Sequence, residues 1–173
     1  MVIWITGLSG AGKTTLSAAL ARLLKPHLPE LVLIDGDVVR ELFGSDLDYS
    51  EASRRRQIQR IQRLATWLEG QGCVAMVAAL YASPDLLEWN RANFDSYCEV
   101  YIEAPIDFLR ARDAKGLYAK AAAGQMPDVV GIDIPWHIPQ RPDFRVDATR
   151  RESPDAIAHR IVAEFPQLSA LIA

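Results

Sequence analysis

The sequence has few residues of the kinds that mark secreted, metal-binding or membrane proteins. Only two of its 173 residues are cysteines, Cys73 and Cys98, and neither has a companion at metal-ligand spacing. Both stand in apolar, strand-like contexts, which favours buried, reduced thiols and a cytoplasmic protein. No apolar run is long enough to cross a bilayer, and the first begins at Val2, so we expect no membrane partner and no signal peptide.

A strong charge of either sign is also missing. The chain has 19 basic and 22 acidic residues, a net charge of −3, so its composition indicates no nucleic-acid or anionic-membrane partner. Half of the residues are hydrophobic and 24% are charged, which is ordinary for a globular protein. Because internal repeats and low-complexity runs are lacking too, we expect a single domain over residues 1–173.

Apolar strand candidates alternate with longer helical segments along the chain. The expected strands cover residues 2–6, 31–35, 73–79, 98–103 and 143–147. The expected helices cover residues 13–25, 51–70, 85–96, 105–112, 115–123 and 153–164. This alternation predicts an α/β protein with three layers, α/β/α, around a mainly parallel five-stranded sheet. Residues 124–142 are rich in proline and glycine and are expected to form a long irregular loop, which in a compact domain is usually functional.

The clearest motif is Gly-Leu-Ser-Gly-Ala-Gly-Lys-Thr at residues 7–14, which fits the phosphate-binding loop G-x-x-x-x-G-K-[ST]. It lies between an apolar strand candidate and an Ala- and Leu-rich helix, the context that its chemistry needs. Its glycines let successive backbone N–H groups point at phosphate oxygens, and a helix N-terminus favours anions. Lys13 would reach the β- and γ-phosphates and the Thr14 hydroxyl would bind Mg²⁺. The motif therefore predicts a P-loop NTPase fold that binds a nucleoside triphosphate.

Two acidic residues follow the second expected strand, at Asp35 and Asp37, with Arg40 one helical turn later. Ligands of parallel α/β sheets gather beyond the carboxyl ends of the strands, where the phosphate loop also lies. The two carboxylates could position Mg²⁺ and take a proton from an attacking hydroxyl. A helix N-cap followed by a turn is the structural alternative, since aspartate is favoured at both.

Further along the chain, basic residues occur in two groups. On the helix expected at 51–70, Arg56, Arg60 and Arg63 share one face, which we interpret as solvated. Arg54 lies nearer the aspartates and is expected to bind an anion, because a guanidinium grips phosphate or sulfate bidentately. The second group, at about 112–125, could form a lid over the triphosphate, although a helix with exposed lysines explains it equally well.

These motifs together resemble one family, the adenylylsulfate (APS) kinases. Residues 7–14 resemble the family's GLSGxGK[ST], and residues 35–40, Asp-Gly-Asp-Val-Val-Arg, resemble its DGDNVR. Residues 46–50, Asp-Leu-Asp-Tyr-Ser, are similar to DLGFS, and Arg54 falls on the arginine of the following DRxEN. Residues 112–118, Arg-Asp-Ala-Lys-Gly-Leu-Tyr, resemble RDxKGLY, and 131–133, Gly-Ile-Asp, match part of FTGIDxPYExP. The resemblance runs from the N-terminus to about residue 147.

The resemblance implies transfer of the ATP γ-phosphoryl group to the ribose 3′-hydroxyl of APS, with Mg²⁺, by a homodimeric enzyme. It implies catalytic roles for Lys13, Asp35 and Asp37, and Mg²⁺ ligands at Thr14 and Asp35. The residues expected to hold ATP are Gly7, Ser9, Gly10, Ala11, Gly12, Lys13, Thr14, Thr15, Arg112 and Lys115. The residues expected to hold the acceptor nucleotide are Asp37, Arg40, Tyr49, Arg54, Gln57, Lys115, Val129, Gly131 and Ile132, partly in a loop at about 124–142.

The departures from the family pattern lie mainly on the acceptor side. Val129 stands where the family has the phenylalanine that helps to sandwich adenine, and Val38 and Gln57 replace asparagines. A relative that acts on another activated nucleotide, such as cytidine diphosphoramidate in surface-polysaccharide synthesis, is therefore an alternative acceptor hypothesis. Two other classes stay open: a small-metabolite or nucleoside monophosphate kinase, and a non-catalytic ATP-binding regulatory module.

Overall fold

A parallel β-sheet forms the centre of the molecule. The computed structural model describes residues 1–44, 46–113 and 116–172. Its five strands are β1 (Val2–Thr6), β2 (Leu31–Asp35), β3 (Val74–Ala79), β4 (Tyr97–Glu103) and β5 (Phe144–Asp147). They lie in the order β2-β3-β1-β4-β5, and all four neighbouring pairs are parallel. The predicted three-layer α/β fold is confirmed.

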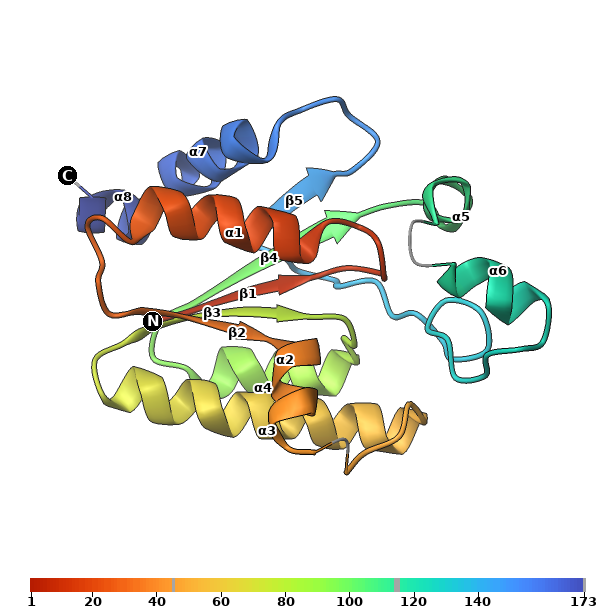
Figure 1. The fold of residues 1–173 in the computed structure, drawn as a ribbon. Coiled ribbons are helices and arrows are strands. Elements are labelled where there is room, and N and C mark those ends of the chain that lie inside the picture. Colours follow the sequence, from red (N-terminus) through yellow and green to blue (C-terminus); the bar gives the residue numbers. More distant parts are fainter. Residues whose placement is uncertain (45, 114–115, 173) are drawn as a thin grey trace.

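Helices cover both faces of this sheet (Figure 1). On one face lie α1 (Lys13–Leu24), α7 (Pro154–Glu164) and α8 (Pro166–Ile172), and on the other α3 (Glu51–Gly70) and α4 (Pro84–Asn93). Two short helices, α5 (Ile106–Arg112) and α6 (Leu117–Ala122), lie beyond the carboxyl ends of the strands. A third, α2 (Gly36–Leu42), follows the carboxyl end of β2 directly and packs on the side of the sheet that carries α3. Among the described residues, no helix combines the length and apolar character that crossing a bilayer requires.

Burial on both faces explains why the central strands are apolar throughout. Every residue of β1 and β3 is buried, so these strands show continuous apolar runs rather than an alternating pattern. Ile5 pairs with Ala78 on one side and with Val100 on the other, which places the end of β1 between two strand ends. The chain segment that leaves β1 therefore starts in the middle of the carboxyl edge.

The predicted strands and helices agree with the structure except at their ends and in two short helices. Each expected strand lies within one residue of an observed one, and the loop at 124–142 contains only an isolated bridge between Val130 and Ile134. The helix expected at 85–96 ends at Asn93, because Phe94 has extended backbone angles. The helices α2 and α8 were not predicted, since seven residues show too little periodicity to reveal a helix.

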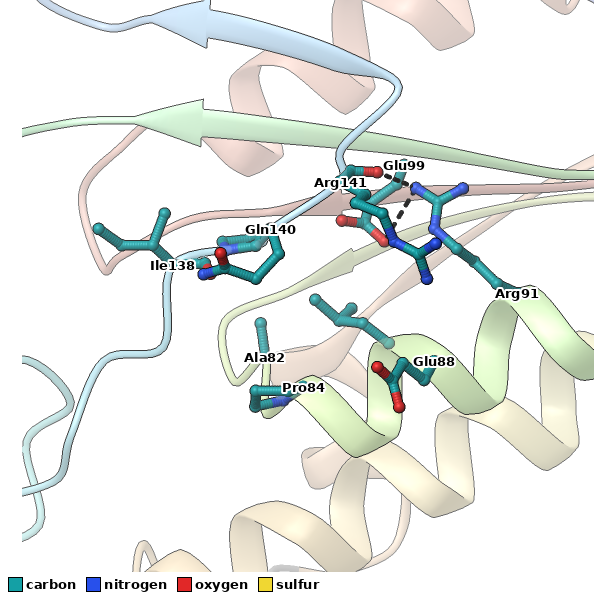
Figure 2. Close-up of a pocket in the computed structure, with 10 residues that line it drawn as sticks. Ala82, Pro84, Glu88, Arg91, Glu99, Ile138, Gln140 and Arg141 are labelled. Atoms are coloured by element: carbon teal, nitrogen blue, oxygen red, sulfur yellow. Dashed lines mark hydrogen bonds and ion pairs between the residues drawn. The ribbon is translucent and has the colours of Figure 1, made fainter.

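An ionic cluster around the buried Glu99 ties the returning end of this loop to the sheet (Figure 2). The Arg91 guanidinium on α4 donates to the backbone oxygen of Arg141 and forms an ion pair with Glu99 at 3.5 Å. It also forms an ion pair with Asp143 at 3.1 Å. The Glu99 side chain is only 2% exposed and also accepts a hydrogen bond from the Tyr97 hydroxyl at 3.0 Å. Burial raises the pKa of Glu99 in spite of the nearby Arg91 charge. The cluster therefore positions the loop at some electrostatic cost.

This cost predicts a pH dependence of stability. Folding raises the pKa of the Glu99 carboxyl above its ordinary value of 4.5. The contribution of this group to the free energy of unfolding is therefore fully present below pH 4.5 and is lost as the pH rises through the pKa of the folded state. We expect the unfolding free energy of Glu99→Gln to fall less than that of the wild type between about pH 5 and about pH 8. Urea unfolding at both pH values measures this, with the exposed Glu88→Gln on the same helix α4 as control. Equal falls in all three proteins would contradict the assignment.

Candidate functional site

The phosphate-binding loop connects β1 to α1 in a tight curl. Gly10 and Gly12 have φ of 77° and 107°, a region that L side chains rarely adopt. Gly7 has φ of 155°, and a Cβ atom there would lie 2.7 Å from the backbone oxygen of Ile102 in β4. Only glycine satisfies both the angle and the close approach. The loop therefore turns sharply into α1, whose first N–H groups face the carboxyl edge of the sheet.

Two side chains at the start of α1 face this curl and the end of β2. The Lys13 ammonium donates to the backbone oxygens of Gly7 at 2.8 Å and Leu8 at 3.0 Å. The Thr14 hydroxyl donates to the Asp35 carboxylate at 3.1 Å. Hydroxyl and carboxylate oxygens are hard ligands of the kind that Mg²⁺ takes, together with phosphate oxygens of a substrate. Thr14 and Asp35 are therefore close enough to bind one magnesium ion together, and this role stays a prediction.

Asp35 has a structural role as well. Its carboxylate accepts a hydrogen bond from the backbone N–H of Asp37 at 2.9 Å, which caps the N-terminus of α2. The helix-cap interpretation is thus correct, and it leaves the functional one open because the second carboxylate oxygen faces Thr14 instead. Capping aims Asp37, in the first turn of α2, toward the phosphate loop.

Two cavities meet at Asp37. The first, of about 250 Å³, lies over the phosphate loop and is lined by Ser9, Gly10, Gly12, Lys13, Thr14, Thr15, Asp35, Gly36, Asp37, Ala78 and Leu80. The second, of about 520 Å³, is lined by Ser9, Asp37, Arg40, Glu41, Tyr49, Arg54, Leu80, Leu117, Lys120, Met126, Pro127, Asp128, Val129 and Val130. They share Ser9, Asp37 and Leu80, so a group bound in one can reach a group bound in the other.

One wall of the second cavity combines an aromatic ring with positive charge. The Tyr49 ring is 55% exposed, and the guanidinium groups of Arg40 and Arg54 lie 4.7 Å and 5.5 Å from its centroid. Arg40 is buried and donates to the backbone oxygens of Leu47 and Asp48. Burial, and then the neighbouring Arg40 charge, lower the pKa of Arg54. Two guanidinium groups held this close together create a strong attraction for an anion.

The opposite wall is the loop that follows α6. Arg54 donates to the backbone oxygen of Asp128 at 2.6 Å, so it links α3 to this loop. The Asp133 carboxylate accepts hydrogen bonds from the backbone N–H groups of Asp128 and Val129. Asp128 itself has a φ of 62°, which is uncommon for a residue with a side chain. These contacts hold Val129 and Val130 against the cavity.

Comparison with known proteins identifies the family. The family model described as adenylylsulphate kinase matches residues 1–147. An adenylyl-sulfate kinase of Chloroflexus aurantiacus is 39% identical over 94% of this chain and 88% of its own length, and one of Geotalea uraniireducens is 38% identical over 91% and 77%. The chain belongs to the adenylylsulphate kinase family.

A solved structure agrees with that assignment. The APS kinase of Mycobacterium tuberculosis in complex with AMPPNP and APS superposes with a TM-score of 0.84 at 31% identity, covering 94% of this chain and 95% of that one. This chain is thus a nucleotide kinase, an enzyme that transfers a phosphoryl group from ATP to an alcohol group with the aid of Mg²⁺. We refer to the first cavity, over the phosphate loop, as the donor cavity and to the second as the acceptor cavity.

Most of the site residues predicted from the sequence line these two cavities, but some do not. Gln57 is buried and its amide donates to the backbone oxygen of Gly36 at 3.0 Å, so it supports the first turn of α2. Gly131 packs against Leu8 and Ile106, and Ile132 is 37% exposed outside the lining of either cavity. The prediction for Lys115 lies outside the described residues.

Arg112 borders the phosphate loop from another side. It lines a smaller cavity of about 150 Å³ together with Ser9, Gly10 and Tyr118, and its guanidinium lies 5.3 Å from the centroid of the Phe108 ring. The Tyr118 hydroxyl donates to the backbone oxygen of Ser9 at 2.9 Å, which ties α6 to the phosphate loop. Helix α6 therefore contacts the phosphate loop, and closure of a lid over the triphosphate stays a prediction.

Sequence reasoning missed several residues of the acceptor cavity: Glu41, Leu80, Leu117, Lys120, Met126, Pro127 and Asp128. Glu41 follows Asp37 by four residues, so a predicted α2 would have placed both on one face. For Met126 and Pro127 the sequence carries no comparable signal, because only the loop conformation brings them to the cavity.

The contacts of Asp133 predict an effect on the acceptor alone. We expect Asp133→Ala to raise the KM for the acceptor nucleotide roughly thirtyfold, because two backbone hydrogen bonds worth about 1 kcal/mol each are lost from the loop. The KM for ATP should stay the same, since the phosphate loop makes no contact with Asp133 among the described hydrogen bonds. Steady-state kinetics with each substrate varied in turn measures both constants, and the exposed Asp107→Ala on α5 is the control. A parallel rise in both constants would show that the loop is not specific to the acceptor.

Proposed function

We propose that the protein transfers the γ-phosphoryl group of ATP to the 3′-hydroxyl of adenylylsulfate. The observation that carries this proposal is the meeting of the donor and acceptor cavities at Asp37. A phosphoryl group bound over the phosphate loop would there face a hydroxyl presented from the acceptor cavity. The relatives named above are adenylyl-sulfate kinases, and the M. tuberculosis structure contains an ATP analogue and APS together, which supports this choice of substrates.

The donor half would work through position and charge. Phosphoryl transfer proceeds through a loose transition state, so the enzyme has to hold the phosphates and neutralise their charge. The N–H groups of the phosphate loop and the start of α1 would hold the β- and γ-phosphates, and Lys13 would exchange the carbonyls of Gly7 and Leu8 for phosphate oxygens. Mg²⁺, held by Thr14 and Asp35, would neutralise charge on the same oxygens.

Asp37 is the proposed base. It stands where the cavities meet, and it lies at the N-terminus of α2 next to Asp35, which caps that helix. Its carboxylate would accept the proton of the 3′-hydroxyl as that oxygen attacks phosphorus. Both the positioning of the hydroxyl in line with the phosphate and the proton transfer itself would raise the rate.

The acceptor half would hold the nucleotide between a ring and a loop. Tyr49 offers an exposed ring face for the base, and Arg40 and Arg54 would attract the phosphosulfate. A second candidate acceptor is a cytidine nucleotide such as cytidine diphosphoramidate. The observation that favours it is Val129, which lines the cavity where the family has a phenylalanine. Loss of one aromatic face would weaken stacking by roughly 1–3 kcal/mol.

The enzyme proposal predicts the effect of removing the base. We expect Asp37→Ala to lower acceptor-dependent ADP release by about 10²–10⁴-fold, the usual contribution of general acid–base catalysis. ATP binding and the circular dichroism spectrum should stay unchanged, because the caps of α2 and the phosphate loop do not use the Asp37 side chain. If the wild type bound ATP but phosphorylated no nucleotide of a panel, that result would instead indicate a regulatory module.

The two candidate acceptors are separated by direct comparison. APS and CDP-linked acceptors, supplied at matched concentration, are compared by ADP release, and we expect a clear preference for APS. Turnover of the cytidine acceptor with negligible use of APS would support the second candidate and contradict the first.

We further propose that the protein is a homodimer in the cytoplasm. Support for the compartment comes from Cys73 and Cys98, which are both free, and burial raises the pKa of the Cys98 thiol. Light scattering after size-exclusion chromatography should give twice the mass of one chain over a wide concentration range. A single-chain mass throughout that range would contradict the dimer.

A further inference from the structure

Glu41 is a carboxylate in a cavity that otherwise carries positive charge. It lines the acceptor cavity together with Arg40, Arg54 and Lys120, and its side chain is exposed. Among the described residues, Glu41 forms no side-chain hydrogen bond and no ion pair. No motif of the phosphate loop and no step of the phosphoryl transfer above uses it. A carboxylate here is unfavourable for an anionic acceptor unless it binds part of that acceptor that donates a hydrogen bond.

We propose that Glu41 reads the base of the acceptor by accepting a hydrogen bond from an exocyclic amine. Resting on the proposed function, this inference assigns the substrate class as nucleotides with an amine-bearing base, adenine or cytosine. A carboxylate is a pure acceptor, so it pairs with an amine and repels a carbonyl oxygen at the same position of the ring. Glu41 is thereby a specificity-determining residue rather than part of the phosphoryl-transfer machinery.

The position of Glu41 on α2 separates it from the reacting hydroxyl. It follows Asp37 by four residues, which places both side chains on one face of the helix about 5–6 Å apart. Asp37 is shared with the donor cavity, whereas Glu41 lines only the acceptor cavity. If the 3′-hydroxyl lies at Asp37, Glu41 meets a part of the nucleotide one helical turn farther from the phosphates of ATP.

The charge and shape of the acceptor cavity decide which part of the nucleotide Glu41 contacts. The anionic arm of the acceptor is repelled by Glu41 and attracted by Arg54 and Lys120, which line the same cavity from α3 and α6. The base needs an aromatic ring, and Tyr49 is 55% exposed, with the guanidinium of Arg40, the residue next to Glu41, 4.7 Å from its ring centroid. A base stacked on Tyr49 thus lies beside the turn of α2 that carries Glu41.

Matched pairs of nucleotides test this assignment. AMP and IMP differ by an amine and a carbonyl at one ring position, as do CMP and UMP. Their affinities are measured by calorimetry on enzyme whose donor cavity is saturated with AMPPNP and Mg²⁺. For the wild type we expect AMP over IMP, or CMP over UMP, by roughly tenfold, the usual effect of a hydrogen bond to a charged group.

The variant Glu41→Gln should remove that preference, because an amide can rotate to offer its NH₂ group to a carbonyl. Its fold is checked by thermal unfolding, and Glu30→Gln, an exposed glutamate just before β2, is the matched control that should keep the wild-type preference. The proposal is overturned if the wild type shows no preference in either pair, or if Glu41→Gln retains it. It is equally overturned if Glu41→Gln weakens all four nucleotides alike, which would point to the ribose.

Failure of the proposed function would look different. It appears as an absence of ADP release with every acceptor, measured separately from these affinities. A base preference that depends on Glu41 in an enzyme without turnover would leave Glu41 as a reader of the base and remove only the kinase proposal.

Discussion

The close approach of the backbone at Gly7 is the constraint on which the rest of the site depends. With no side chain, Gly7 lets the end of β1 pass within van der Waals contact of the Ile102 carbonyl in β4 and then turn into α1. Because β1 lies between β3 and β4, the turn opens in the middle of the carboxyl edge. The connection that leaves β1 leads to β2 on one side of β1, whereas the connection that leaves β3 leads to β4 on the other side of β1. Because these two connections diverge at the carboxyl end of β1, a crevice forms at this point.

The two halves of the site are built by different means, and this explains how they can diverge separately. The donor half consists largely of backbone N–H groups whose direction is set by glycine geometry, with Lys13 and Thr14 at a helix start. The acceptor half consists of side chains from α2, α3, α6 and the loop after α6. A substitution such as valine for phenylalanine at residue 129 changes one wall without moving the phosphate loop.

The same difference explains how much the sequence could predict. Lys13, Thr14, Asp35 and Asp37 were predicted because a local motif or a strand end determines their place. Glu41 and Met126 were not, because α2 is too short for a periodic signal and because long-range contacts such as the bond from Arg54 to Asp128 set the loop. Gln57 was assigned to the acceptor by its place in a motif, but the face of α3 that carries it packs against Gly36.

The arginines of the acceptor cavity are held in place by backbone oxygens of the protein itself. Arg40 is fixed by two backbone oxygens and Arg54 by two others, one on each side of the cavity. Each guanidinium therefore loses most of its rotational freedom. An anion that enters meets charges already in position, so binding costs little further ordering of the protein. The bond from Arg54 to the loop has a second consequence: the guanidinium on α3 and the loop that carries Val129 are joined into one connected structure.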